Sequence, residues 1–510
     1  MTTLLPAESV PRSAAIARAR TRPRAVVIGA GLGGLATAAR LAHGGYQVTV
    51  LERHHVPGGR AGLWESVGFR FDTGPSLVLM REYWQQLFRD VGRRLEDYVT
   101  LVQLDPNYRI HYPDGSTLEV TSRINALLEN VEAIEPGASQ GLLRFLGRSG
   151  DLYRKGLAFV DRNMHEPSAM FSLRHLGMLL GTGALGSLRR MVGRFVADER
   201  LRDALTFQSL YLGLSPYESM AIYSLLPYTE IAGGLYYPMG GVHRLSLALA
   251  QLAAELGAEL RYGAAVSRIE RDGGRASGVV LADGSRIAAD LVVSNADLPY
   301  TYASLLGEPY PAIDRMEFSC SVVLMYLGVS RQYRQLLHHN LIVPRDMRKA
   351  CDDIFHRHRM PEEPPFYVCA PSRTDASVAP PGCDSLFVLV LAPSQDPARP
   401  IDWTVEGPRV EARMLERLEA FGLKELRRHL VTKRLFTPDD FRRDFGNLRG
   451  EAFGLSHGLR QIGYVRPHNR HPAVSNLYFV GQSTHPGCGL PMVLISARCV
   501  AERVLAEQPV

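Results

Sequence analysis

The glycines between positions 29 and 34, and the acid that follows them, have the types and spacing that point most directly to chemistry. Gly29, Gly31 and Gly34 form a G-x-G-x-x-G pattern after a short apolar run, and Glu52 ends the next such run. In a strand–turn–helix unit these glycines allow a tight turn, a close approach of a pyrophosphate and close helix packing, while the acid accepts from a ribose hydroxyl. The pattern therefore predicts a dinucleotide site, against the alternative of an ordinary turn with tight glycines. The same predicted turn contains Ala30, Leu32 and Gly33.

A second glycine turn follows the acid. Arg53 opens a short spacer, and Gly58, Gly59 and Arg60 come next. Paired glycines let the backbone pass close to a cofactor, and an arginine can reach phosphate or carbonyl oxygens. The alternative is a plain surface turn, but the position just after the strand-end acid favours the cofactor interpretation.

The composition limits the classes of protein to which this chain can belong. The 510 residues are too many for one core, so two to three domains are expected. A net charge of +6 is mild over this length, and the chain has no zinc-ligand spacing and no nucleic-acid-binding signature. We therefore expect neither a metal nor a nucleic-acid partner. The six cysteines are scattered without a C-x-x-C pair, which favours reduced thiols and a cytoplasmic location.

Two segments resemble targeting or membrane sequences. The run 25–42 is nearly free of charge, but its glycine spacing and Arg40 argue against a membrane span. Residues 1–23 are rich in Ala, Arg and Ser and lack a secretory apolar stretch. We interpret them as a disordered basic tail, with a transit peptide as the alternative.

The dinucleotide signals are distributed over the start, middle and end of the chain. Residues 236–300 return to alternating helix and strand patterns, with turns at Gly273-Gly274 and Asp283-Gly284, and residues 475–510 give a strand, a Gly/Pro turn and a final helix. A hairpin is predicted around Pro113–Gly115, and residues 124–230 read as mostly helical. We therefore predict one dinucleotide-binding domain from 24–90, 236–300 and 475–510. A second domain is predicted from 91–235 and 301–474.

Several stretches resemble one enzyme family. Glu52 with Gly58-Gly59-Arg60 resembles the second FAD fingerprint of the amine oxidase and carotenoid desaturase superfamily, and Phe71–Ser76 resembles the F-D-x-G-P-S element of CrtI-type carotenoid desaturases. The similarity to phytoene desaturases extends over 211–218, 223–230, 236–243, 366–375 and 379–383, and 477–497 is similar to the family's terminal signature. In all, the resemblance runs from residue 24 to 506.

The resemblance implies an α/β fold with FAD as cofactor. It implies a Rossmann-like FAD-binding domain assembled from discontinuous segments, with an inserted mixed α+β substrate domain that includes a helical, membrane-associating part. It adds further FAD-binding residues to those above: Gly74, Pro75, Ser76, Val266, Gly481, Gln482, Pro491, Met492 and Val493. In the wider flavoprotein group an acid often stands where this chain has Gln482, so the ribityl contact stays open.

The resemblance also implies a reaction. A saturated CH2–CH2 step in a carotenoid hydrocarbon, with phytoene as the leading substrate, would lose a hydride to FAD and a proton, and oxygen or a quinone would receive the electrons. Alternatives within the family are desaturation of a hydroxylated carotenoid or of a diapocarotenoid. Alternatives outside it are an amine or porphyrinogen oxidase and a non-catalytic prenyl-binding escort protein.

Two polar residues are candidates for catalysis. His485 lies in the 481–489 turn expected beside the flavin ring, with a purely structural histidine as the alternative. Glu230 could accept a proton if burial raised its pKa, with a salt-bridged or exposed acid as the alternative.

The substrate of such an enzyme resides in a bilayer. Residues 173–195 mix apolar side chains with five basic ones and could lie in the membrane interface, with arginines towards anionic headgroups. A helix pair with a solvated basic face is the alternative. We therefore expect a cytoplasmic protein associated peripherally with a membrane.

Overall fold

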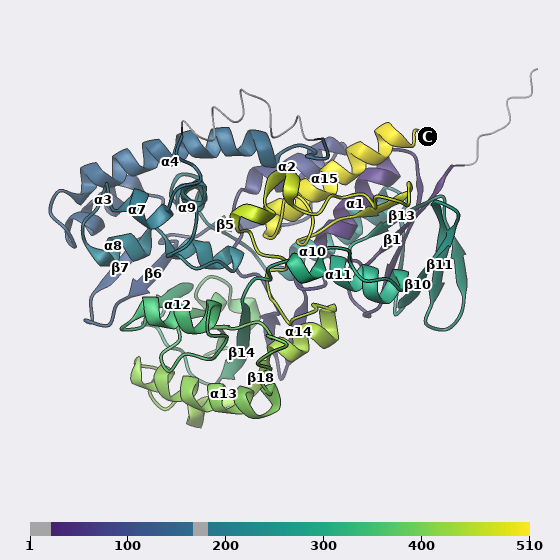
Figure 1. Cartoon of the computed structure of the whole chain (residues 1–510). Coiled ribbons are helices and arrows are strands. Elements are labelled where there is room, and N and C mark those ends of the chain that lie inside the picture. The colour runs from purple at the N-terminus through teal and green to yellow at the C-terminus, as the bar shows by residue number, and fades with distance from the viewer. Residues whose placement is uncertain (1–21, 167–181) are drawn as a thin grey trace, which may run out of the picture.

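The computed structural model describes residues 22–166 and 182–510 (Figure 1). The predicted tail 1–23 lies almost wholly outside this range, and so does the first part of the predicted amphipathic stretch, residues 173–181. Among the described residues no helix has both the length and the apolar character needed to cross a membrane. The run 25–42, whose membrane-span interpretation the glycines argued against, forms a strand and a helix.

A parallel sheet of five strands collects distant parts of the chain. Its order is β19 (Leu477–Phe479), β13 (Leu291–Ser294), β1 (Arg24–Ile28), β2 (Gln47–Glu52) and β9 (Glu259–Tyr262). Strand β1 pairs with β2 on one side and with β13 on the other, and β19 extends the sheet beyond β13. The predicted meeting of N-terminal, middle and C-terminal stretches is therefore present in one sheet. The predicted domain boundaries themselves remain a proposal.

Alternating side chains of β1 bind the sheet to its two covering layers. Ala25 and Val27 point into a core shared with α1 (Leu32–His43), α10 (His243–Glu255) and α15 (Leu490–Glu507). Val26 and Ile28 point to the opposite core, which the antiparallel sheet β10 to β12 supplies. Helix α15 lies directly beside α1, as Figure 1 shows. The last helix of the chain thus packs on the first.

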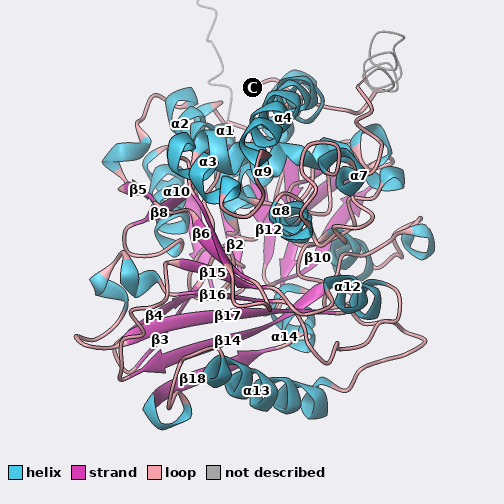
Figure 2. Cartoon of the chain, turned by 90° about the vertical axis from the view of Figure 1, so that its left-hand side faces the viewer, coloured by secondary structure: helices cyan, strands magenta, loops and turns pink. Residues whose placement is uncertain are grey.

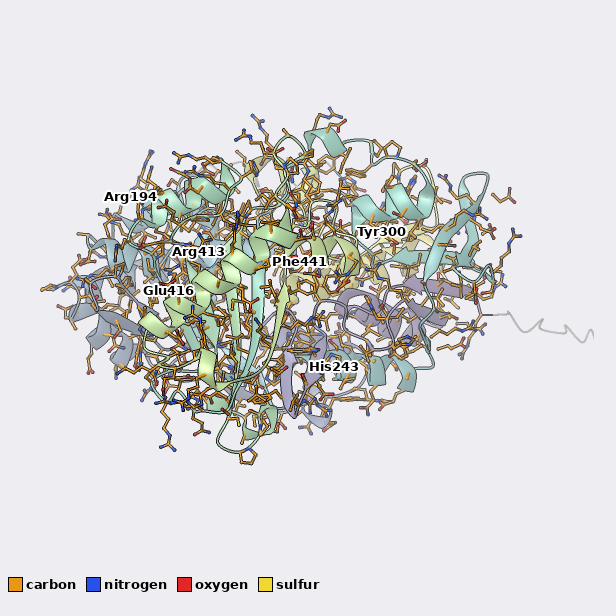
Figure 3. The ribbon with its side chains drawn as sticks, turned by 90° about the horizontal axis from the view of Figure 1, so that it is seen from below. Arg194, His243, Tyr300, Arg413, Glu416 and Phe441 are labelled. Carbon is orange, nitrogen blue, oxygen red and sulfur yellow. The ribbon has the colours of Figure 1, made fainter. Side chains whose placement is uncertain are left out.

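A second, seven-stranded sheet forms the other half of the molecule. Its strands, in spatial order, are β18 (Leu430–Phe436), β14 (Ser321–Val329), β17 (Asp384–Ala392), β16 (Phe366–Cys369), β15 (His339–Ile342), β6 (Tyr108–His111) and β7 (Thr117–Val120). The sheet therefore combines strands from 91–235 with strands from 301–474. Helix α13 (Trp403–Ala420) covers one face, seen from below with Arg413 and Glu416 in Figure 3. Its buried side chains pack on β14 and β17. Figure 2 shows α3, α4 and α9 on the far side of this sheet from α13.

The helices between β7 and β8 pack into a separate core with β6 and β7. Ser187 and Asp198 cap α7 and α8 by accepting hydrogen bonds from backbone N–H groups. The hairpin predicted around Pro113–Gly115 is formed by β6 and β7, and the predicted turns at Gly273-Gly274 and Asp283-Gly284 join β10, β11 and β12.

The strands outside the two large sheets are β3 (Leu63–Ser66), β4 (Phe69–Asp72), β5 (Leu101–Gln103), β8 (Tyr236–Pro238), β10 (Val266–Asp272), β11 (Arg275–Leu281) and β12 (Arg286–Ala288). The remaining α-helices are α2 (Arg81–Asp90), α3 (Ile124–Glu132), α4 (Ala138–Val160), α7 (Leu188–Val192), α8 (Glu199–Ala204), α9 (Leu225–Gly233), α11 (Leu298–Tyr300), α12 (Met347–Phe355) and α14 (Pro438–Phe445).

Candidate cofactor and substrate site

One cavity of about 750 Å³ connects the two halves of the molecule. At one end it is lined by backbone of the two glycine turns and of the 481–493 segment. At the other end it is lined by apolar and aromatic side chains, among them Leu152, Phe207, Ile222 and Leu341. A concave site with a polar end and a long apolar wall suits a cofactor and an apolar substrate side by side.

The first glycine turn is closed by contacts that leave no room for side chains. The Gly29 amide donates to the carbonyl of Leu51 at 2.7 Å. A Cβ on Gly34 would lie 2.1 Å from the Gly29 carbonyl oxygen, and one on Gly31 would lie 2.7 Å from the side-chain nitrogen of Asn295. Helix α1 begins without a side-chain cap and without an acid in its first turn, so its N-terminal N–H groups suit an anion.

Glu52 is fixed at the end of β2 by two backbone amides. One carboxylate oxygen accepts from Ala30 N at 2.7 Å and the other from His54 N at 2.9 Å. Each oxygen keeps a second lone pair, and the residue lines the cavity. The carboxylate is therefore held where it can accept from a ribose hydroxyl.

The second glycine turn lies against the first. Gly58 N donates to Ala30 O at 2.8 Å, and a Cβ on Gly74 would lie 2.2 Å from the Arg60 carbonyl oxygen. The Arg60 side chain donates to the carbonyl of Ala452 at 3.2 Å. Burial lowers the pKa of Arg60, and the negative charge of Asp297 acts in the opposite direction. These loops together form a narrow cradle that contains the positive charges of Arg53 and Arg60.

The C-terminal turn is held by a buried arginine. The Arg466 guanidinium donates to the carbonyl of Thr484 at 2.9 Å and to that of Gln482 at 2.6 Å, and also to carbonyls of 455, 456 and 461. Burial lowers the pKa of Arg466 to about 10, so it stays charged at neutral pH. Beyond the turn, α15 begins without a side-chain cap, and its first residues face the cavity. The positive end of this helix dipole therefore points into the site.

Most of the predicted cofactor residues line this one cavity. They are Gly29, Gly31, Leu32, Gly33, Glu52, Arg53, Gly58, Gly59, Arg60, Gly74, Pro75, Ser76, Val266, Gly481, Gln482, Pro491, Met492 and Val493. Ala30 and Gly34 lie just behind the lining and shape the turn through the contacts given above. A dinucleotide fits this site, because backbone N–H groups, the anchored carboxylate of Glu52 and the half-buried Arg60 line it. Whether each residue contacts the cofactor stays a prediction.

His485 lines the cavity but is engaged by the protein. Its Nε2 lies 2.8 Å from the carbonyl oxygen of Arg162, so Nε2 carries the hydrogen. Burial lowers the pKa of His485 to about 4, so the ring is neutral at pH 7. The geometry favours a positioning role for His485, and its catalytic role stays a prediction.

Glu230 lies behind the cavity wall. It is completely buried, and its carboxylate accepts from the Tyr108 hydroxyl at 2.9 Å and from Gln208 Nε2 at 3.1 Å. Burial raises the pKa of Glu230 to about 7, although hydrogen bonds to its carboxylate act to lower it. Tyr108 and Tyr211 stand between Glu230 and the cavity and line it themselves. Any proton reaching Glu230 would therefore pass through a tyrosine hydroxyl.

Sequence reasoning missed four polar residues at the cofactor end, of which Asp297, Glu451 and Arg466 are buried and Asn295 is half-buried. Asn295 lies across the first glycine turn, and Asp297 accepts from the Ser483 hydroxyl at 2.6 Å. Burial raises the pKa of Asp297 and of its neighbour Glu451. The signal for Asn295 and Asp297 was their place directly after a parallel strand, where ligands bind in such sheets. Nothing local marked Glu451 or Arg466.

Comparison with known proteins assigns the chain to a family. Residues 32–505 match the family of flavin-containing amine oxidoreductases. A zeta-carotene-forming phytoene desaturase of Myxococcus xanthus is 47% identical over 487 residues, which cover 94% of each chain. A lycopene-forming phytoene desaturase of Pseudescherichia vulneris is 37% identical and covers 95% of this chain and 99% of that protein.

The fold has a solved counterpart. An oxidoreductase from Methanosarcina mazei superposes with a TM-score of 0.62 at 19% identity, covering 94% of this chain and 100% of that one. At this identity the match speaks for the fold alone. The two desaturases above are 37–47% identical over nearly the full length, and this similarity favours a desaturase over the amine oxidase, porphyrinogen oxidase and escort alternatives. The chain therefore belongs to the flavin-containing amine oxidoreductases and, within them, to the CrtI-type carotenoid desaturases, which are FAD-dependent oxidoreductases.

Proposed function

We propose that this desaturase acts on phytoene and forms ζ-carotene. The observation that carries the proposal is the single cavity that joins the cofactor cradle to a long apolar wall. The ζ-carotene-forming relative is 47% identical, whereas the lycopene-forming one is 37% identical. This difference favours ζ-carotene over lycopene as the product. Desaturation of a hydroxylated carotenoid or of a diapocarotenoid is the second candidate, because an apolar wall also suits these substrates.

The cofactor and the protein divide the chemistry. FAD, when bound, accepts the hydride and with it the two electrons that leave the CH2–CH2 step. The cradle residues hold the cofactor edge against the cavity, and the apolar wall holds the hydrocarbon and excludes water. A hydrocarbon offers no hydrogen-bond handle, so the wall selects a substrate by length and shape, at about 1–3 kcal/mol for each methylene.

The second hydrogen leaves as a proton and needs an acceptor. We assign this role to Glu230, reached through the hydroxyl of Tyr108, which donates to the carboxylate at 2.9 Å. A carboxylate with a pKa of about 7 is half ionised near neutral pH, which suits a general base. His485, with a pKa of about 4 and its Nε2 engaged by a backbone carbonyl, is the weaker acceptor.

Access to the substrate requires a membrane surface, and we propose that the helical part provides contact with it. Within the described part of residues 173–195, Arg190 and Arg194 are exposed. Arg189 instead forms ion pairs with Glu199 and Asp203 and lies over the ring of Tyr217. Headgroup binding is therefore expected from Arg190 and Arg194. Oxygen or a quinone is the proposed final electron acceptor.

Expression in a host that accumulates phytoene tests the substrate. We expect ζ-carotene in extracts, measured by chromatography and absorbance, and unchanged phytoene with the Gly34→Ala variant. Lycopene as the end product would contradict the proposal that the reaction ends at ζ-carotene. Unchanged phytoene with a flavin-loaded wild-type protein would overturn the substrate and favour a hydroxylated or diapo precursor.

A further inference from the structure

A cluster of soft ligand side chains lies on two paired strands at the edge of the cavity. His338 immediately precedes β15, and His339, the first residue of that strand, pairs with Cys369 at the end of β16. One ligand atom from each of these three side chains lies within 4.8 Å of the other two. All three residues are buried, and His339 also lines the cavity.

The hydrogen bonds of the two imidazoles leave one nitrogen of each ring available. Nδ1 of His338 lies 2.7 Å from the hydroxyl of Thr374, and Nδ1 of His339 lies 2.6 Å from the hydroxyl of Tyr367. Among the described residues, neither buried Nε2 has a hydrogen-bond partner. Histidines that bind a metal through one nitrogen are usually oriented by such a bond at the other.

The hydroxyl group of a neighbouring tyrosine is a possible fourth ligand. The ring of Tyr237 lies 4.7 Å from that of His338, centroid to centroid, and its buried hydroxyl also lacks a partner in the described part of the chain. Leaving buried polar atoms unpaired costs about 1–3 kcal/mol each. The two unpaired imidazole nitrogens and the unpaired hydroxyl leave these side chains with donor atoms available for a common ligand.

The surrounding charges suit a cation. The carboxylates of Asp72 and Asp375 are close enough to act electrostatically on Tyr237, Asp72 also acts on Cys369, and Asp375 on His338. Asp72 is held by the amides of 242 and 243, and Asp375 by the amide of 240 at 2.6 Å. A divalent ion that converts the thiol to a thiolate leaves one positive charge, which these carboxylates can offset.

We propose that His338, His339 and Cys369 bind a zinc ion, with the hydroxyl of Tyr237 or a water as fourth ligand. Nitrogen and sulfur donors select a borderline-soft ion over magnesium or calcium. Zinc bonds of about 2.0–2.3 Å place ligand atoms about 3.3–3.6 Å apart, so the cluster needs only small side-chain rotations. Binding releases the thiol proton and changes no oxidation state. The ion would join β15 and β16 beside the cavity without taking part in hydride transfer.

Zinc binding to the FAD-loaded protein tests the proposal. The protein is stripped with a chelator, dialysed, and titrated with zinc chloride in a calorimeter, with metal content measured by mass spectrometry. We expect one zinc per chain, a loss of affinity of about 100-fold in Cys369→Ser and His339→Gln, and a loss of about 10-fold in Thr374→Ala. Cys351→Ser, which removes a buried thiol elsewhere, is the matched control and should bind as wild type.

Flavin content, read from visible absorbance, verifies that each variant is folded. Zinc affinity that is unchanged in flavin-loaded Cys369→Ser overturns the proposal, as does wild-type protein that takes up no zinc. If both variants fail to fold, cobalt added to stripped wild-type protein decides. A thiolate-to-cobalt charge-transfer band supports the site, and its absence means that the cluster holds only water.

Discussion

The two ends of the cavity differ in which parts of the polypeptide line them. The cofactor end is mainly backbone, with glycine turns, anchored amides and uncapped helix starts, and it adds a few charged side chains such as Glu52 and Arg60. The substrate end is side chain: leucine, isoleucine, phenylalanine and tyrosine on helices and strands from all parts of the chain. Backbone geometry tolerates few residue types, whereas an apolar wall tolerates many of similar volume.

This difference predicts that the cofactor end tolerates few substitutions, whereas the substrate end can change without loss of the cofactor. A substitution in the cradle displaces the cofactor, and all chemistry is lost with it. A substitution in the wall changes the fit of a hydrocarbon by a few kcal/mol at most. The following predictions test this division, from the largest expected effect to the smallest.

Gly34→Ala should abolish cofactor binding. Its Cβ would lie 2.1 Å from the Gly29 carbonyl oxygen, so α1 must move away from β1 and from the pyrophosphate position. We expect flavin affinity to fall by at least about 100-fold, as for a displacement of about 1 Å at a site. The ratio of flavin to protein absorbance measures it. Gly147→Ala, at a helical glycine with open space around it, is the control and should retain flavin. A flavin-loaded Gly34→Ala protein would contradict the claim that close packing at this glycine is needed for cofactor binding.

Arg466→Met should destabilise the whole fold. The change leaves carbonyl oxygens of the C-terminal turn buried without donors, among them those of Thr484 and Gln482. We expect a loss of about 3 kcal/mol in the free energy of unfolding, measured with urea. The exposed Arg190→Met should change it by less than about 0.5 kcal/mol. Equal stability of the two variants would show that the C-terminal turn does not need the hydrogen bonds of Arg466.

Glu230→Gln should alter the pH dependence of both activity and stability. With a pKa of about 7, Glu230 is the proposed base only when ionised, so wild-type turnover should rise from pH 6 to 8. The variant should be slower by about 100-fold and lose that rise. Its flavin content should match wild type. The exposed Glu129→Gln is the control.

The stability effect of Glu230 has the opposite sign. Because the folded protein raises the pKa above its ordinary value of 4.5, ionisation costs stability as pH rises from about 4.5 through 7. The cost reaches about 3 kcal/mol above pH 7. Glu230→Gln should therefore gain relative to wild type between pH 5 and pH 8 in urea unfolding. A constant difference would remove Glu230 as the titrating group.

Leu341→Phe should have the smallest effect. Leu341 lines the apolar wall, and a larger side chain shortens the space for the hydrocarbon. We expect a change of about tenfold in kcat/KM for phytoene with normal flavin content. Leu448→Phe, at an exposed leucine, should leave kcat/KM unchanged. Loss of flavin in Leu341→Phe would show that the two ends of the cavity are not separable.

The same division separates what the sequence predicts from what it hides. The glycine turns, Glu52 and the discontinuous sheet were predictable, because tight turns demand glycine at fixed spacing and because the strand patterns recur at 291 and 477. The pairing of His339 with Cys369 was not, since the two residues lie on different strands and no local spacing reveals their register.

Buried polar residues of the inserted half were equally hidden. Glu230 was a candidate, but its position behind Tyr108 and its raised pKa follow from helix packing that no single stretch specifies. Arg466 looks in the sequence like any surface arginine, yet it is fully buried and holds the terminal turn. Long-range burial decides the role of such residues, and a sequence pattern does not encode it.

The position of β19 at the edge of the parallel sheet has a consequence for biosynthesis. Strand β19 and the helix after it are synthesised long after β13, the strand with which β19 pairs. A nascent chain of 470 residues would lack the 481–493 segment that completes the cofactor end of the cavity. We therefore expect flavin to bind only after residues 477–493 have been synthesised, and a chain that stops before them to be colourless and to expose apolar surface to chaperones or proteases.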